Sequence, residues 1–272
     1  MKNNKIMTII KGMIVGGTML VPGVSGGSMA MILNIYDKLV SAVSSFSKHK
    51  KENLLFLSLF SIGGGLGVLL FANPLLHLIE KYPMPMLYFF LGAVAGGIPL
   101  IYKQANIKHF SWKVPVYIFL GILIVLLLTI LPIENSPSEM EQGSTNFILL
   151  ILAGFVAAVA LVLPGISVSY LLLLMGLYDK TMRAISDFHF PFLISLGIGL
   201  LLGIILTTKI LDGAMTKYPQ PTYLMILGFV LCSMSEVFPG FPTGLETFIC
   251  MITLVSGFFI IRLLSWKETT KI

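Results

Sequence analysis

Apolar residues run along this chain in long blocks that short polar segments separate. Each block is long enough, or nearly so, to cross about 30 Å of hydrocarbon as an α-helix. The seven blocks are residues 54–71, 84–101, 114–131, 147–163, 192–206, 223–237 and 247–264. The pattern therefore predicts an all-α polytopic membrane protein.

Composition supports membrane insertion, because the chain has too few charges to solvate a soluble domain. Hydrophobic residues make up 56% of its 272 positions, charged residues 11%, and the mean hydropathy is +0.95; a soluble domain carries roughly 25% charged residues. The net charge of +6 does not indicate a nucleic-acid partner, because the basic residues gather in short loops, as membrane topology requires. Cys232 and Cys250 both lie in apolar segments, which favours a packing role.

The sequence repeats itself when it is shifted by 142 residues. Residues 12–46 then align without gaps on residues 154–188, with 10 identical pairs in 35 positions. Both copies contain Pro-Gly-x-Ser followed by Tyr-Asp-Lys at the same separation. A shared apolar composition does not explain such matches, so the chain contains two copies of one unit, as many secondary transporters do.

The likeness continues downstream at a slightly different offset, because Lys-Tyr-Pro at 81–83 matches Lys-Tyr-Pro at 217–219. We expect each unit to contain a re-entrant helical hairpin and three transmembrane helices. The first unit covers residues 1–135, with its hairpin at 12–46 and spans at about 53–72, 84–102 and 114–133. The second covers residues 146–265, with its hairpin at 147–188 and spans at about 191–210, 222–238 and 245–264.

Proline and glycine near the start of each unit explain why a hairpin is expected there. Proline removes a backbone donor and glycine tolerates almost any backbone conformation, so Pro22-Gly23 and Pro164-Gly165 should break their helices inside the membrane. If both segments turn back, fifteen of the 18 Lys and Arg residues lie on one side; if both cross, the split is nine to nine. Positive residues favour the cytoplasm, so we expect two hairpins, a second unit inserted with inverted topology, and cytoplasmic termini.

The tips of these hairpins carry the chemistry of an anion site. Unpaired N–H groups at the start of a helix bind anions, glycine allows close approach, and serine adds hydroxyl donors. Two facing tips at mid-depth would form a neutral, donor-rich pocket suited to a phosphate or carboxylate. The alternative interpretation is that small residues only pack the two hairpins closely. The candidates are Pro22, Gly23, Ser25, Gly26, Gly27 and Ser28 in the first tip and Pro164, Gly165, Ser167 and Ser169 in the second.

The other ionisable residues give weaker signals. Arg183 falls on the outer side in the hairpin topology, where it would either receive an anionic headgroup or anchor its segment at the interface. Asp37-Lys38 and Asp179-Lys180, at the hairpin ends, are interpreted as interfacial anchors. No metal site or cofactor is predicted, because the four histidines share no ligand spacing. Neither an ATPase nor a hydrolase is supported, since the sequence has no Walker motif and no GxSxG.

A known signature stands in two segments of the chain, PGVSGGSMAMILNIYDKLVSAV and LPGISVSYLLLLMGLYDKTMRAI. They resemble the bacterial polyprenyl-phosphate translocase family (PopT type), and the resemblance covers essentially the whole chain. It implies a transporter rather than an enzyme, which carries undecaprenyl phosphate, the carrier lipid of cell-wall synthesis, from the outer to the inner leaflet of the bacterial plasma membrane for recycling. It also implies that the tip residues bind the phosphate. The family's second motif usually has a glycine where Val168 stands here.

Three functions therefore stay open. The first is a lipid-phosphate translocase that uses no ATP. The second is a transporter or channel for a small soluble anion that uses the same tips in a closed vestibule. The third is an assembly scaffold without transport. The expected partners are the polyprenyl-phosphate lipid and the bilayer, with no nucleic acid, and self-association into a homo-oligomer is left open. A lateral opening towards lipid would separate the first function from the second.

Overall fold

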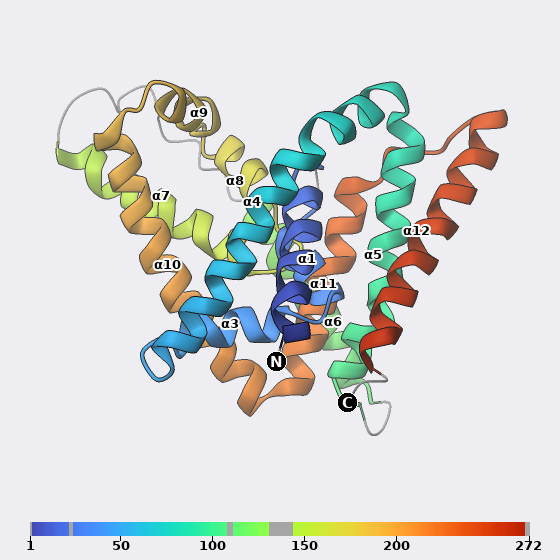
Figure 1. The fold of residues 1–272 in the computed structure, drawn as a ribbon, viewed down its shortest axis with the longest axis horizontal. Coiled ribbons are helices and arrows are strands. Elements are labelled where there is room, and N and C mark those ends of the chain that lie inside the picture. The colour runs from blue at the N-terminus through green and yellow to red at the C-terminus, as the bar shows by residue number, and fades with distance from the viewer. Residues whose placement is uncertain (1, 22–23, 108–110, 131–143, 270–272) are drawn as a thin grey trace.

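The structure is a computed structural model that describes residues 2–21, 24–107, 111–130 and 144–269 (Figure 1). Within these residues the chain forms helices and no strands, which confirms the all-α class. The first half contains α1 (Lys2–Thr18), α2 (Gly26–Ile32), α3 (Tyr36–Ser44), α4 (Lys50–Lys81), α5 (Pro83–Gln104) and α6 (Lys113–Ile130). The second half contains α7 (Ser144–Val162), α8 (Val168–Leu174), α9 (Tyr178–Ser186), α10 (Phe190–Lys217), α11 (Pro219–Val237) and α12 (Leu245–Thr269).

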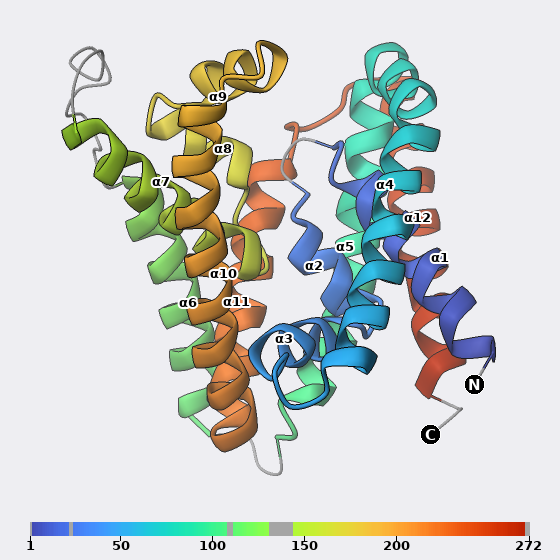
Figure 2. The same cartoon turned by 60° about the vertical axis from the view of Figure 1, so that its left-hand side comes forward.

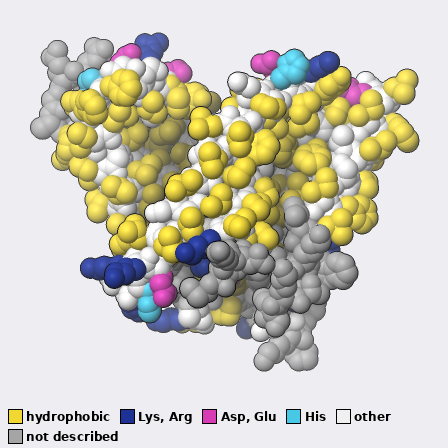
Figure 3. All heavy atoms as spheres, viewed as in Figure 1, with side chains coloured by type: hydrophobic (Ala, Val, Ile, Leu, Met, Phe, Trp, Pro, Cys, Tyr) yellow, Lys and Arg dark blue, Asp and Glu magenta, His cyan; other side chains and the backbone are white. Residues whose placement is uncertain are grey.

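Several of these helices are suited to a bilayer. Within the described ranges, α4, α5, α10 and α12 are long and apolar enough to cross a membrane, and shorter apolar helices cover 113–127 and 147–162. Hydrophobic side chains cover the flank of the molecule, while charged side chains gather at its two ends (Figure 3). The protein is therefore a helical, multi-pass membrane protein.

The helices α4 and α10 extend beyond the spans that the sequence predicts at 53–72 and 191–210. Pro74 lies inside α4 without ending it, because neighbouring groups in a membrane protein can satisfy the backbone carbonyl that a proline frees. Both helices continue to the Lys-Tyr-Pro segments, where Pro83 and Pro219 open the next helix. Proline is favoured in the first turn of a helix, since its missing N–H has no partner there anyway.

The chain turns back between α1 and α2 and again between α7 and α8 (Figures 1 and 2). α2 begins directly after Ser25 and α8 directly after Ser167, the serines of the two Pro-Gly-x-Ser motifs. α3 lies at the end of the molecule where α1 begins, and α9 lies at the end where α7 begins (Figures 1 and 2). The chain therefore returns to its starting end over α1–α3 and again over α7–α9. α3 and α9 lie at opposite ends of the molecule.

The turn that separates the two short helices is the same in both halves. Asn34 and Gly176, which are 142 residues apart, adopt left-handed backbone conformations with φ of 53° and 63°. The N–H of the next residue reaches back to the short helix in each case: Ile35 donates to the Ala30 carbonyl at 3.0 Å and Leu177 donates to the Leu172 carbonyl at 2.9 Å. A left-handed residue with such a bond is a common way to end a helix, so the sequence repeat is also a repeat of local structure.

Glycine brings four pairs of helices into close contact. α1 packs on α4 and, in the other half, α7 packs on α10; between the halves, α5 packs on α12 and α6 on α11. A Cβ added to Gly67 of α4 would collide with the backbone of Met13 in α1. Likewise, a Cβ on Gly199 of α10 would collide with the backbone of Ile151 in α7. Small residues allow this approach in membranes, where packing rather than water exclusion joins helices.

The two hairpins pack differently against the rest of the protein. α3 packs on α10, and α2 packs on α5 and touches α7. Among the described residues, no packing of comparable extent joins their counterparts, α9 to α4 or α8 to α11. Although α5–α12 and α6–α11 join the halves, the parts that carry the hairpins, α1–α4 and α7–α10, meet at the α3 end and diverge towards the α9 end. This gives the molecule its V shape in Figure 1.

Candidate functional site

The start of α2 meets the second Pro-Gly-x-Ser segment. A Cβ added to Gly27, in the first turn of α2, would lie 3.1 Å from the Cα of Pro164 and 3.3 Å from its nitrogen. Such a separation is tighter than an ordinary Cβ contact, so a side chain at Gly27 would require the second segment to shift by a few tenths of an ångström. The structure thus brings two candidate residues, one from each segment, into contact.

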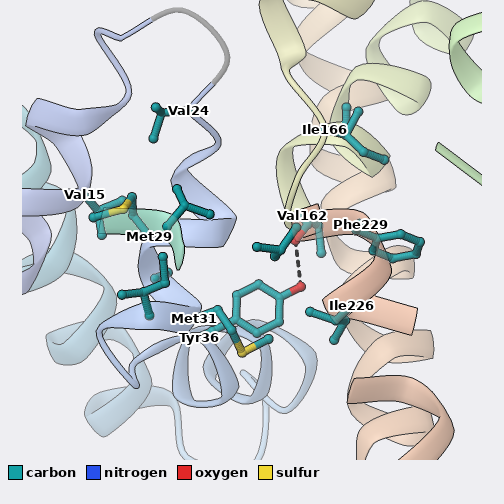
Figure 4. Packing of buried hydrophobic residues seen from close by; sticks show 14 of the residues in the cluster. Val15, Val24, Met29, Met31, Tyr36, Val162, Ile166, Ile226 and Phe229 are labelled. Carbon is teal, nitrogen blue, oxygen red and sulfur yellow. Dashed lines mark hydrogen bonds between the residues drawn. The ribbon is translucent and has the colours of Figure 1, made fainter. Parts of the chain in front are cut away.

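Tyr36 links the two halves beside this contact. Its hydroxyl donates a hydrogen bond of 2.8 Å to the carbonyl of Val162, and the dashed line in Figure 4 marks this bond. Val162 is the last residue of α7, where the ending helix leaves carbonyl groups without intrahelical partners. Tyr36 is buried. The hydroxyl of the first hairpin therefore satisfies a carbonyl that the break in the second hairpin leaves free.

The start of α2 presents backbone donors at the junction. Ser25 is extended, with φ −79° and ψ 132°, and its side chain does not cap the helix. The first helical bond runs from the N–H of Met29 to the carbonyl of Ser25, at 3.1 Å. The N–H groups of Gly26, Gly27 and Ser28 precede this bond, so they are the groups that a helix start leaves for an outside acceptor.

Ser28 adds a hydroxyl to these donors. Its side chain is only 1% exposed, and its Oγ has no hydrogen-bond partner. Burying a hydroxyl without a partner costs about 1–3 kcal/mol. An acceptor bound at the start of α2 would recover that cost.

The second segment is fixed by its packing on α11. Gly165 has a φ of 85°, and a Cβ there would collide with the backbone of Phe229. Pro164 is fully buried, Ser167 is half-buried and Ser169 is exposed. The N–H of Leu171 bonds to the carbonyl of Ser167 at 3.0 Å, so α8 is anchored at the serine of the motif.

A cavity of about 330 Å³ adjoins the junction. Gly26 and Gly27 line it together with Leu161 and Val162 at the end of α7, so both hairpins contribute to its wall. Its other walls come from α1, α3, α4 and α10. Figure 3 shows the surface hollowed between α4 and the lobe that contains α7 and α10. The donors at the start of α2 therefore lie next to a mainly apolar space.

The remaining sequence candidates lie elsewhere. Arg183 is exposed on α9, at the end where the halves diverge, and it does not line the cavity. Pro22 and Gly23 lie outside the described residues. The candidates therefore divide into a central group around Gly27 and Pro164 and one separate charge on α9.

Sequence reasoning missed a polar cluster that joins the halves at the α3 end. Tyr223 of α11 donates a hydrogen bond of 2.8 Å to Oδ2 of Asp37 on α3. Ser44, at the other end of α3, donates a bond of 2.6 Å to Oδ2 of Asp212 on α10. Asp37, interpreted from the sequence as an interfacial anchor, is thus a contact between the halves. A lone aspartate in an apolar run, such as Asp212, is the signal that would have indicated this cluster.

Asp37 lies in a setting that disfavours its charge. Burial raises the pKa of its carboxyl group above the usual value, the hydrogen bond from Tyr223 opposes this, and the charge of Asp212 adds to the increase. Its Oδ1 is buried without a hydrogen-bond partner. Burial at the closed α3 end therefore makes the carboxyl group of Asp37 easier to protonate than one in water.

Within the described part of the chain, no cluster of three or more His, Cys, Asp and Glu side chains is placed to hold a metal ion. The available chemistry is that of backbone N–H groups and hydroxyl groups beside an apolar cavity. Groups of this kind are suited to an anion that carries an apolar portion.

Broken helices that meet inside a multi-pass membrane protein are common among secondary transporters. The chain belongs to the undecaprenyl phosphate translocase-like family, whose model matches residues 15–251. This confirms the family resemblance that the two signature segments indicated. No solved structure matches the chain.

Two curated relatives share one name with each other. The polyprenyl-phosphate transporter of Staphylococcus aureus is 33% identical over 271 residues, which cover 96% of each chain. The polyprenyl-phosphate transporter of Vibrio cholerae serotype O1 is 27% identical over 250 residues, which cover 87% of this chain and 78% of the relative. The similarity to the Staphylococcus aureus relative thus extends over both hairpins.

Proposed function

We propose that the protein moves undecaprenyl phosphate from the outer to the inner leaflet of the bacterial plasma membrane, without ATP, so that the carrier is reused in cell-wall synthesis. The contact between Gly27 and Pro164, beside unpaired donors and an apolar cavity, is the observation that carries the proposal. The names of the two relatives support a polyprenyl phosphate as the substrate.

The phosphate is held at the junction of the tips. Moving a bare anion into a medium of low dielectric constant costs on the order of 20 kcal/mol by Born reasoning, so protein donors must replace its water. The N–H groups at the start of α2 and the hydroxyls of Ser25 and Ser28 supply donors from the first tip. Pro164 and Gly165 shape the second tip, which also contains Ser167 and Ser169. The proposed site further includes Pro22 and Gly23, which precede Ser25 in the sequence.

Reconstitution in liposomes tests this function. Undecaprenyl phosphate placed in one leaflet should equilibrate between leaflets faster in liposomes with the protein than in empty liposomes, with no ATP present. The same vesicles are tested for passage of inorganic phosphate. Equilibration of the lipid at the empty-vesicle rate, with passage of inorganic phosphate, would replace this proposal by the transporter or channel for a small anion.

Ser28→Ala separates binding from stability. In the absence of substrate, the variant should melt at a temperature equal to or above that of the wild type, because it removes a buried hydroxyl that has no partner. Its affinity for undecaprenyl phosphate should fall by about 1.5–3 kcal/mol, the range for a hydrogen bond to a charged group. Thermal melts with and without the lipid measure both effects. Unchanged affinity would remove Ser28 from the site. Ser169→Ala, which replaces an exposed serine, is the comparison within the second tip.

The two halves are inserted with opposite topology in this proposal, and both termini are cytoplasmic. Ser47, just beyond α3, and Ser186, the last residue of α9, are both exposed, so a cysteine can be introduced at either position. In a background that lacks Cys232 and Cys250, the two cysteines should react with a membrane-impermeant maleimide from opposite faces, Ser47→Cys from the cytoplasm. Labelling of both positions from one face would contradict the inverted topology.

Arg183 captures the headgroup on the outer side. A guanidinium group pairs with phosphate oxygens in a bidentate manner, and α9 lies at the end where the halves diverge. Arg183→Ala should slow uptake from the outer leaflet, and Arg183→Lys should restore it only in part. Lys38→Ala, at the opposite end on α3, is the matched control and should affect this uptake less. Equal uptake by wild type and Arg183→Ala at matched incorporation would leave Arg183 as an interfacial anchor.

A further inference from the structure

The cavity beside the junction has chemistry of its own. Apart from the backbone, its polar lining is confined to Tyr36, Ser61 and Thr208. The hydroxyl of Tyr36 already bonds to Val162, and that of Thr208 bonds to the carbonyl of Ile204 at 2.6 Å. Both hydroxyls are therefore used within the protein, and among the described residues that line the cavity the other side chains, apart from Ser61, are aliphatic or aromatic. Such a space is suited to a hydrocarbon and offers little to a hydrated anion.

The cavity is placed between the junction and the lipid-facing surface. On its inner side it touches Gly26 and Gly27, which belong to the first tip. On its outer side it is lined by Phe60 and Ser61 of α4 and by Ile204 of α10. Ser61 is exposed, and Figure 3 shows the surface hollowed between α4 and the lobe that contains α10. The cavity therefore connects the site proposed for the phosphate with a lateral opening between α4 and α10.

The surface around this opening is that of a lipid-facing wall. Large apolar side chains stand exposed on both helices, among them Leu69 at 78% on α4 and Leu201 at 61% on α10. Figure 3 shows hydrophobic side chains on both sides of the hollow. Charged groups that would repel a hydrocarbon chain are absent from the residues that line the cavity.

We infer that this cavity binds the part of the polyprenyl chain nearest the phosphate, and that the rest of the chain leaves sideways into the bilayer between α4 and α10. The inference rests on the proposed function and names the portion of the substrate that contacts this surface. A volume of about 330 Å³ is at the small end for a ligand pocket, which ranges over roughly 300–1,000 Å³. It admits only the first few isoprene units, so recognition does not depend on the full length of the chain.

Photo-crosslinking tests where the chain lies. p-Benzoylphenylalanine is placed at Phe60 or Ile204 in the cavity, and at Leu69 or Ile210 on the outer faces of the same two helices. After irradiation in liposomes that contain undecaprenyl phosphate, each cavity position should give about tenfold more lipid adduct than the outer position on the same helix. A tenfold ratio corresponds to a free-energy preference of about 1.4 kcal/mol for the cavity. Farnesyl phosphate in excess should suppress the cavity adducts alone. Equal adducts at cavity and outer positions would overturn the inference.

A steric block gives a second measurement. Ile204→Trp fills the opening and should slow leaflet exchange of undecaprenyl phosphate by about tenfold, a barrier increase of 1.4 kcal/mol. Leu201→Trp, on the same helix but outside the cavity, should leave it unchanged. Exchange at the wild-type rate in Ile204→Trp, together with equal crosslinking, counts against the cavity while the proposed function stands. Cavity-specific adducts from a wild-type protein that moves no lipid would instead refute the proposed function and leave the chain-binding site in place.

Discussion

Gly67→Leu is expected to prevent the first half of the protein from folding. Gly67 lies where α4 crosses α1, and any Cβ there would collide with the backbone of Met13. A backbone cannot rotate away as a side chain does, so the two helices must separate. Overpacking of a core costs about 1–3 kcal/mol even where side chains can adjust, and here the helix pair itself is lost. We expect little monodisperse protein after detergent extraction, as measured by fluorescence-detected size-exclusion chromatography.

The chain provides a matched control two residues away. A Cβ at Gly65, also on α4, would have no neighbour within 4 Å, so Gly65→Leu should be extracted like the wild type. The same pairing exists in the other half, because Gly199 contacts the backbone of Ile151 and Gly197 has open space. Gly199→Leu should therefore fail where Gly197→Leu succeeds. Comparable behaviour of Gly65→Leu and Gly67→Leu would contradict glycine-mediated packing as the basis of these helix pairs.

Gly165→Ala is expected to abolish transport. The φ of 85° at this position costs an alanine about 1–2 kcal/mol, and its Cβ would also collide with the backbone of Phe229 on α11. The second segment must then move away from α11, which shifts Pro164 relative to Gly27 and alters the junction. We expect a loss of at least about tenfold in leaflet exchange of undecaprenyl phosphate, equivalent to 1.4 kcal/mol in the barrier.

Its control is a glycine that tolerates a side chain. Gly213→Ala on α10 would add a methyl group with no neighbour within 4 Å, and its transport should match that of the wild type. Thermal melts of both variants show whether Gly165→Ala still folds. Transport at the wild-type rate by Gly165→Ala would mean that the geometry of the second segment is irrelevant to the site.

A helix break at Pro164-Gly165 could be predicted because adjacent proline and glycine both disfavour a helix locally. The left-handed turns at Asn34 and Gly176 were not predicted, although both residue types tolerate a positive φ. The full length of α4 was not predictable in this way. Whether Pro74 ends a helix or is absorbed by it depends on what surrounds it, which no local pattern records.

The sequence indicated the close approach of the two tips but not what surrounds them. Glycine and serine at the tips indicated donors and close approach, and the contact of Gly27 with Pro164 is of that kind. The apolar cavity next to it is built from six helices, so no single segment contains its signature. The bond from Tyr223 to Asp37 joins residues 186 apart, and only the packing of α11 beside α3 brings them together.

That polar cluster has no counterpart in the repeat. At the offset of 136 residues that aligns the Lys-Tyr-Pro segments, Leu87 stands where Tyr223 does and Leu76 stands where Asp212 does. If the halves exchange roles during transport, so that α9 docks on α4, neither bond can form. Each bond contributes about 0.5–3 kcal/mol, and 1.4 kcal/mol is a tenfold population difference. An empty carrier would therefore rest almost entirely with the α9 end open, and the bound lipid would have to supply the free energy that releases it.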